Sequence, residues 1–241
     1  MNKIWTIARR ELGVFFDSLT AYILLVVFLA FTGAFTWLFM ADVFLYNQAS
    51  MQSFFNVAYW TFFVLIPALT MRLIAEEKNS GTLELLLTKP VSDWQVILGK
   101  FTASLVLVGI ALALSLPYYI TIASIGPIDH GAVWTGYLGL LLMCATYISI
   151  GIFTSSISDN QIVSFLLALF IGIFFHWIFD IVASTFTGVL GEVFSFLSVS
   201  THYDSVSRGV IDSKDIIFFL SIIFIALIAS EASLSKRNIV D

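Results

Sequence analysis

Charged residues and cysteine are scarce in this 241-residue sequence. Asp, Glu, Lys and Arg make up only 11% of it, whereas ordinary globular domains contain about 25% charged residues. Hydrophobic residues account for 59%, which is more apolar surface than a soluble domain of this size can bury. The shortage of charge therefore excludes an ordinary soluble protein and indicates that a lipid bilayer surrounds most of the chain.

The single cysteine, Cys144, excludes an intrachain disulfide, and no metal-binding spacing of Cys and His occurs. Cys144 lies in an apolar run, where we expect a small packed side chain. The glycine-rich phosphate loop Gly-x-x-x-x-Gly-Lys-Ser/Thr is also missing, because Gly99-Lys100 is followed by Phe101 and has no upstream glycine. We therefore expect a non-catalytic chain that contains no cofactor and does not bind ATP by this route.

Long intervals without charged residues dominate the sequence. A helix rises about 1.5 Å per residue, so roughly 20 residues cross the hydrocarbon core of a bilayer. Five intervals are long enough, and a sixth qualifies if Glu231 lies near the headgroups. We predict a single all-α polytopic membrane domain over residues 1–241. Its six transmembrane helices are expected at about 20–41, 54–74, 101–125, 132–153, 162–183 and 216–234.

Positive charges are distributed unevenly between the two sides of these spans. Six spans place both termini on one side of the membrane. Only Arg208 and Lys214 fall on the opposite side. The side of the termini has Lys3, Arg9, Arg10, Arg72, Lys78, Lys89, Lys100, Lys236 and Arg237. Because cytoplasmic loops carry the excess of Lys and Arg, we predict that both termini are cytoplasmic.

The amino-terminal segment, residues 3–18, has the pattern of an amphipathic helix. Arg9, Arg10, Glu11 and Asp17 fall outside its apolar face. The apolar stripe, which recurs at helical spacing, comprises Ile4, Trp5, Ala8, Leu12, Phe15, Phe16 and Leu19. Next to a first span, such a helix is expected to lie along the cytoplasmic headgroup layer. It either anchors the chain to lipid or also supports a partner protein.

Polar residues near the outer end of the fifth span are candidates for a function within the membrane. His176 and Asp180 are four residues apart. We expect a hydrogen-bonded pair at the headgroup level, and the alternative is a proton relay. His202, Asp204 and Arg208 follow in the outer segment and are expected to form a polar cluster.

Residues 76–91 form a charged segment between the second and third apolar runs. We expect the second span to continue as one helix through Arg72, Ile74 and Glu77. Gly81 should end this helix, because glycine tolerates the left-handed conformation. Thr82 is a suitable N-cap for a short helix that ends before Pro90. Beyond it, the sequence Ser-Asp-Trp-Gln at 92–95 matches a capping box that begins the next helix.

Four leucines and three glutamates gather in this segment: Leu83, Leu85, Leu86, Leu87, Glu76, Glu77 and Glu84. An apolar patch with an acidic rim fits a socket on another protein that is lined by basic residues. The alternative is a solvated loop whose leucines dip into lipid.

The order of residues in the segment also resembles a family signature. Glu-Glu-Lys-x-x-Gly-Thr-Leu-Glu-Leu-Leu-Leu-Thr-Lys-Pro-Val over 76–91 resembles the hallmark of ABC-2-type permeases. The similarity is greatest to the gliding-motility-associated permease subunits of Bacteroidetes-type bacteria. Further similar segments lie at 66–72, 158–161 and 207–212, so the resemblance covers nearly the whole chain.

This resemblance implies an architecture and partners. The family has six spans, an amino-terminal interfacial helix, a cytoplasmic coupling helix between spans two and three, and outer half-inserted helices, here at about 186–200. It implies two copies of an ABC ATP-binding subunit, which hold the ATP and Mg, and a second permease, identical or homologous, in a bacterial inner membrane. An auxiliary membrane or periplasmic subunit is a further candidate, and no nucleic acid is expected. By position, the coupling element comprises Glu76, Glu77, Gly81, Thr82, Leu83, Glu84, Leu86 and Pro90.

Two functions remain open at the level of sequence. The first is the transmembrane permease subunit of an ATP-driven ABC-2-type transporter, with export expected from the resemblance. The second is a membrane anchor or energy-transducing subunit of a motility or secretion assembly that carries no solute. An intramembrane enzyme or a passive channel has little support, because no catalytic cluster and no ring of pore-lining charges stands out.

Overall fold

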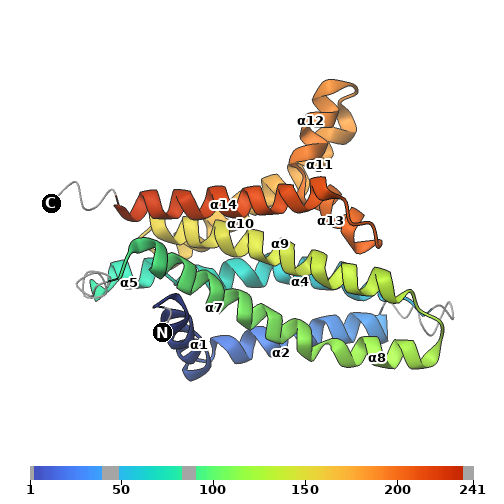
Figure 1. The fold of residues 1–241 in the computed structure, drawn as a ribbon, viewed down its shortest axis with the longest axis horizontal. Coiled ribbons are helices and arrows are strands. Elements are labelled where there is room, and N and C mark those ends of the chain that lie inside the picture. The colour runs from blue at the N-terminus through green and yellow to red at the C-terminus, as the bar shows by residue number, and fades with distance from the viewer. Residues whose placement is uncertain (1–2, 40–48, 83–90, 236–241) are drawn as a thin grey trace.

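The computed structural model describes residues 3–39, 49–82 and 91–235. Within these ranges the regular secondary structure is entirely helical (Figure 1). Six helical units are long and apolar enough to cross a membrane: Thr20–Phe39, Gln52–Asn79, Asp93–Ile125, His130–Ile157, Gln161–Thr185 and Ser213–Ser235. The predicted all-α polytopic fold with six spans is therefore confirmed.

Four of these units consist of more than one helical segment. The first contains α2 (Thr20–Ala34) and the π-helical turn η1 (Phe35–Phe39), and the second contains α4 (Gln52–Thr70) and α5 (Ala75–Asn79). The third contains α7 (Asp93–Leu114) and α8 (Leu116–Ile125). The fifth contains α10 (Gln161–Ile173), the π-helical turn η2 (Phe174–Ile178) and α11 (Phe179–Thr185). The fourth and sixth are the single helices α9 (His130–Ile157) and α14 (Ser213–Ser235).

Helix α9 forms the centre of the bundle. It packs against α4, α7, α10 and α14, and it is the most completely buried of the six units. Small residues permit this packing, since a Cβ atom at Gly151 would overlap the side chain of Thr70, and one at Gly136 would overlap the ring of Phe55. Such close contacts replace the hydrophobic effect as the force that holds helices together in lipid. Cys144 is a free, buried thiol within α9, as expected.

The prediction of one continuous helix through Arg72, Ile74 and Glu77 is wrong. Turns at 71–74 separate α4 from α5. The hydroxyl of Ser155 in α9 compensates for this break. It accepts hydrogen bonds at 3.0 Å from the backbone N–H groups of Ile74 and the next residue, and it donates one at 3.0 Å to the carbonyl of Met71. A membrane helix can break where a neighbouring side chain supplies the missing partners.

The predicted capping box at the start of the third unit is present. Ser92 Oγ accepts a hydrogen bond of 3.3 Å from the backbone N–H of Gln95, and the Gln95 side chain accepts one of 3.3 Å from the backbone N–H of Ser92. This reciprocal pair satisfies two N–H groups that otherwise have no partner at a helix start. Helix α7 therefore begins at Asp93, before the predicted start of the span at 101.

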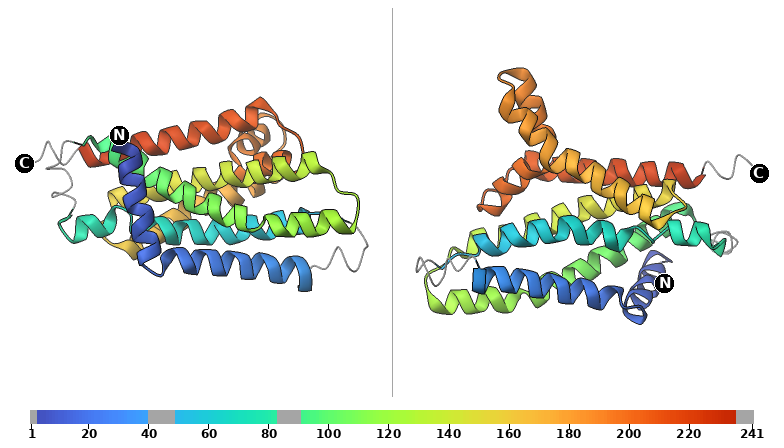
Figure 2. Two further views of the ribbon diagram at one scale, coloured as in Figure 1. Left: turned by 60° about the horizontal axis from the view of Figure 1, so that its bottom comes forward. Right: turned by 180° about the vertical axis from the view of Figure 1, so that it is seen from behind.

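Both described ends of the chain lie at the same end of the bundle as α5 (Figure 1). Helix α1 (Lys3–Asp17) lies across this end and packs on α7 (Figure 2). Its buried side includes Ile7 and, against the prediction, Glu11, whereas Trp5 of the predicted stripe is exposed. The prediction is wrong for Glu11, because α7 brings Lys100 to it and a paired carboxylate can be buried. The place of α1 at a membrane surface stays a prediction.

At the opposite end, the chain forms α12 (Val189–Leu197) and α13 (Val199–Ser207). Helices α11 and α12 pack on each other and project away from the bundle (Figures 1 and 2). The predicted outer segment at about 186–200 covers α12 and the first turn of α13. Its insertion into the outer part of a membrane stays a prediction.

The expected polar cluster of His202, Asp204 and Arg208 is divided in two. His202 Nδ1 lies 2.6 Å from Asp215 Oδ1 at the start of α14, and His202 Nε2 lies 2.8 Å from the carbonyl of Phe196. Asp204 and Arg208 form a separate, exposed ion pair at 3.6 Å. His202 is separated from Asp204 and Arg208 because its ring is buried where α13 packs on α14, and the buried Asp215 of α14 lies within hydrogen-bond distance of it.

The packing around α9 predicts that Gly151→Ala destabilises the fold. The added methyl group overlaps Thr70, and overpacking of this kind costs about 1–3 kcal/mol. The free energy of unfolding in mixed micelles is the measurement. Gly109→Ala in α7 is the matched control, because no atom lies within 4 Å of a Cβ at that position. Equal stability of the two variants would contradict the packing argument.

Candidate coupling site

The predicted coupling element divides into a described and an undescribed part. Leu83, Glu84, Leu86 and Pro90 lie outside the described residues. Glu76 and Glu77 lie on α5, and Gly81 and Thr82 follow it. Gly81 has a φ of 68°, the left-handed conformation expected where glycine ends a helix.

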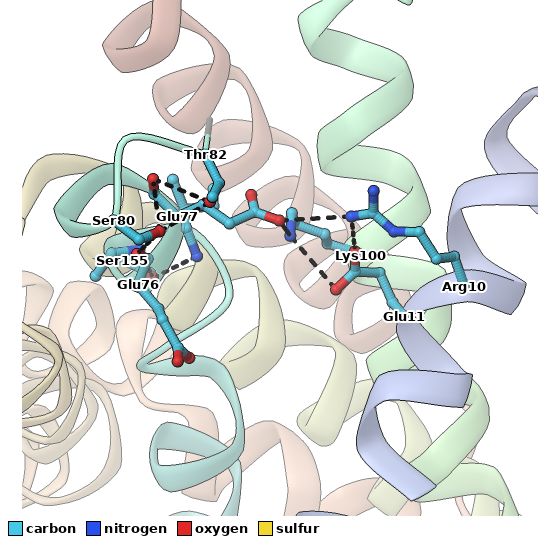
Figure 3. A network of polar contacts seen from close by, with 10 residues as sticks. Arg10, Glu11, Glu76, Glu77, Ser80, Thr82, Lys100 and Ser155 are labelled. Atoms are coloured by element: carbon cyan, nitrogen blue, oxygen red, sulfur yellow. Dashed lines mark hydrogen bonds and ion pairs between the residues drawn. The ribbon is translucent and has the colours of Figure 1, made fainter. Parts of the chain in front are cut away.

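Lys100 of α7 holds Glu77 in a buried ion network (Figure 3). The Lys100 side chain is 1% exposed, and its ammonium group lies 2.8 Å from Glu77 Oε1 and 3.4 Å from Glu11 Oε2. Arg10 completes the network at distances of 2.5 Å from Glu11 Oε1 and 3.5 Å from Glu77 Oε1. Three segments that are far apart in the sequence, α1, α5 and α7, therefore meet at one set of charges.

The network is balanced, because its two carboxylates face one ammonium and one guanidinium. Burial of a charge is unfavourable unless an opposite charge and hydrogen bonds replace water. Lys100 is almost fully enclosed, so its position is fixed by Glu11 and Glu77 together. One buried oxygen, Glu77 Oε2, has no hydrogen-bond partner in the described structure.

Helix α9 and the turn after it hold the other side of α5. Ser155 binds the backbone where α5 begins, as described above. Lys78 lies 3.1 Å from the carboxylate of Asp159, which follows α9. The Ser155 contact joins α5 to the most buried helix of the bundle, and the Lys78–Asp159 pair joins it to the turn after that helix. A displacement of α5 therefore has to move α9 or break these bonds.

Arg72, in the turn before α5, joins this region to the first span. Its guanidinium hydrogen-bonds to the hydroxyls of Ser18, at 2.9 Å, and Thr20. These residues connect α1 to α2. The turn between α4 and α5 is thus fixed on two sides, by Arg72 toward the first span and by Ser155 toward α9.

The two neighbouring glutamates of α5 face different surroundings. Glu76 is exposed, whereas Glu77 points to Lys100 and Arg10 (Figure 3). Glu76 and the exposed residues Ser80 to Thr82 are therefore available to another protein, and Glu77 positions α5 within the chain. This difference in surroundings could not be predicted from the sequence, because both residues belong to one acidic pair.

Sequence reasoning missed three residues of this arrangement: Glu11, Lys100 and Ser155. A Lys at the end of a span usually extends its ammonium to the water, so its position alone did not indicate burial. The one signal for an ion network was the presence of acidic residues in both neighbouring polar segments. Nothing in the sequence marked Ser155, since a serine in a membrane helix usually bonds within its own helix.

The second predicted pair, His176 and Asp180, does not form the expected hydrogen bond. His176 Nδ1 lies 2.9 Å from the hydroxyl of Tyr147 in α9, and His176 Nε2 has no hydrogen-bond partner. The π-helical turn η2 contains His176 and places it among aromatic rings, while Asp180 follows in α11. Both residues line one cavity near the end of the bundle that is remote from α5.

Comparison with known proteins gives one match. A family model described as ABC-2 family transporter protein matches residues 5–229. The match covers all six helical units except the last residues of α14. No curated protein matches the chain.

The buried network predicts that Lys100→Met destabilises the protein. The substitution removes the buried cation and leaves the Glu11 and Glu77 carboxylates with only the half-exposed Arg10, and the loss of one partner from a buried ion pair costs about 3–5 kcal/mol. The free energy of unfolding in mixed micelles measures it. The matched control is Lys214→Met, which removes a lysine from an exposed pair with Asp212 and should cost less than about 1 kcal/mol. A similar loss in both variants would refute the structural role of the network.

Proposed function

The chain belongs to the ABC-2 family of transporter proteins, and we propose that it couples ATP hydrolysis in a separate nucleotide-binding subunit to the movement of a substrate across a membrane. It is a transmembrane permease of the ABC transporter type by family. The observation that supports coupling through residues 76–91 is the fixation of α5 by Lys100 and Ser155. A segment that receives force has to be connected rigidly to the helices that it moves.

The proposed mechanism is a two-state movement. ATP binding closes a dimer of ATP-binding subunits, and the coupling element moves with them. The Glu77–Lys100 contact transmits this movement to α7, and the bonds of Ser155 transmit it to α9. To shift an equilibrium from 1:99 to 99:1 takes about 5.5 kcal/mol. A loosely held segment would move by itself and would not transmit this free energy to the transmembrane helices.

The proposed assembly follows from the family. Two ATP-binding subunits dock on two permeases, which are identical or homologous, and an auxiliary membrane or periplasmic subunit is a further candidate. The end of the bundle that has α1, α5 and both described chain ends faces the cytoplasm of a bacterial cell. This orientation agrees with the excess of Lys and Arg at that end. Export is the proposed direction.

The second candidate function is an energy-transducing anchor in a motility or secretion assembly. The resemblance of residues 76–91 to gliding-motility permeases supports it. Both functions use the same coupling element, and they differ in whether a solute moves. Compounds that stimulate ATP hydrolysis by the purified complex would favour transport over anchoring.

The backbone at Gly81 provides one test of the coupling element. Gly81→Ala places a side chain at positive φ, which costs about 1–2 kcal/mol and should weaken the affinity of the ATP-binding subunit about five- to thirtyfold. Titration of that subunit onto the permease in nanodiscs measures it. The matched control is Gly188→Ala at the other end of the bundle, which also has positive φ and open space around it. Equal affinities for the two variants would argue against docking at Gly81.

The undescribed part of the element provides a second test. The double variant Glu84→Lys with Leu86→Asp reverses one charge of the acidic rim and places a carboxylate in the apolar patch. We expect the protein to insert in the membrane but to lose stimulated ATP hydrolysis, because the socket on the partner no longer fits. Insertion is checked by protease protection. Unchanged hydrolysis in the inserted double variant would count against coupling through this segment.

A further inference from the structure

A cavity of about 620 Å³ lies near the end of the bundle remote from α5. Its walls come from the first turns of α4, from η2 and α11 in the fifth unit, and from α13. It is separated from the coupling element by roughly 20 Å along the second unit. Cavities of this size hold drug-sized ligands.

Aromatic rings form the inner wall of this cavity. Tyr59 stacks between Tyr203, with ring centroids 4.5 Å apart, and His176, at 4.2 Å. Trp60 stands edge-on to His176 at 4.5 Å and to Trp177 at 5.4 Å. Rings of Trp attract cations through their negative faces. Trp60 and Trp177 are both partly exposed, whereas both faces of Tyr59 are covered by its stacking neighbours.

Two buried polar atoms at this wall have no partner. The Tyr59 hydroxyl and His176 Nε2 are both buried and make no hydrogen bond in the described structure. His176 Nδ1 is already engaged by Tyr147, so only Nε2 is free to bind something else. Most buried polar groups have a hydrogen-bond partner, and each exception in a folded protein needs an explanation. Both atoms are enclosed within the wall, so they leave two uncompensated polar groups behind it but make no direct contact with a ligand.

Carboxylates gather at the mouth of the cavity. Asp180 and Asp204 line it together with one cation, Arg208, which pairs with Asp204 at 3.6 Å. Asp180 has no ion-pair partner among the described residues. Burial raises the pKa of the Asp204 carboxyl above its ordinary value, Arg208 opposes this rise, and the negative charge of Asp180 adds to it. The lining thus has two carboxylates, Asp180 and Asp204, and one cationic side chain, Arg208.

The backbone adds an independent indication. His176 and Trp177 lie in η2, a π-helical turn within an otherwise α-helical span. Such turns are rare and occur frequently at functional sites, because the extra residue redirects the side chains that follow. Here the turn contributes two residues to the cavity.

We propose that this cavity binds an organic monocation, an amine whose ammonium group lies between Asp180 and Asp204 and whose apolar part lies against Tyr59 and Trp60. The proposal concerns binding alone. It does not rest on the coupling function, because it is tested without ATP and without an ATP-binding subunit.

The test is a calorimetric titration of the full-length chain in lipid nanodiscs with 2-phenylethylamine and, separately, with its neutral analogue 2-phenylethanol. We expect saturable binding of the amine and none of the alcohol. Asp180→Asn and Asp204→Asn should each weaken amine binding about tenfold, because each removes one charge from a partly desolvated site. Arg208→Gln should strengthen it, since it removes the competing cation.

Matched controls distinguish the cavity from the general surface charge. Asp212→Asn and Lys214→Gln make the same charge changes nearby, in a pair that does not line the cavity, and should leave amine binding unchanged.

Three results would overturn the proposal. The first is an absence of saturable amine binding by the unmodified chain. The second is an equal effect of Asp180→Asn and Asp212→Asn, which would assign the binding to surface potential. The third is weaker or unchanged binding in Arg208→Gln. None of these results would affect the Gly81 test, so failure of the ligand site and failure of the coupling function can be told apart.

Discussion

The ion network around Lys100 holds together the end of the bundle where α1, α5 and α7 meet, which is the end that we propose faces the cytoplasm. The Lys100 side chain is 1% exposed, and burial of a charge is unfavourable without opposite charges around it. Lys100 has two such partners, Glu11 and Glu77, from segments 66 residues apart in the sequence. The burial of Lys100 therefore fixes α1, α5 and α7 relative to one another. Removal of any one partner leaves an unbalanced charge in the interior, which is more unfavourable than the loss of a surface ion pair. This requirement makes α5 a rigid part of the bundle.

Helix α9 connects the two regions of interest in the molecule. Its Ser155 holds the start of α5, and its Tyr147, two turns away, bonds to His176, which lines the cavity. A rigid displacement of α9 would therefore reach both sites. Because the helix is central and closely packed, through glycines that contact neighbouring side chains, it can move only together with its neighbours or by repacking. The proposed ligand site and the proposed docking site are thus both in contact with this one helix.

The features that the sequence predicted correctly are those that depend on local pattern. The six spans follow from the length and hydropathy of uncharged intervals, and the Ser92–Gln95 capping box follows from two residues three apart. The errors concern partners from distant segments. Glu11 was assigned to a polar face, although Lys100 binds it in the interior. His176 was paired with its helical neighbour Asp180, although Tyr147 of another helix is its partner.

The sequence alone determined that the chain lies in a membrane, because 11% charge is too little for a soluble surface, and it determined the number of helices that cross. Tertiary structure decided where those helices break and which polar groups meet. A break between α4 and α5 is stable only because Ser155 lies opposite it, and the cavity exists only because α4, η2 and α13 converge. The physical reason is that the free energy of placing a residue in lipid depends mainly on the polarity of that residue itself. An ion pair, a hydrogen bond or a cavity instead requires two surfaces at a defined distance.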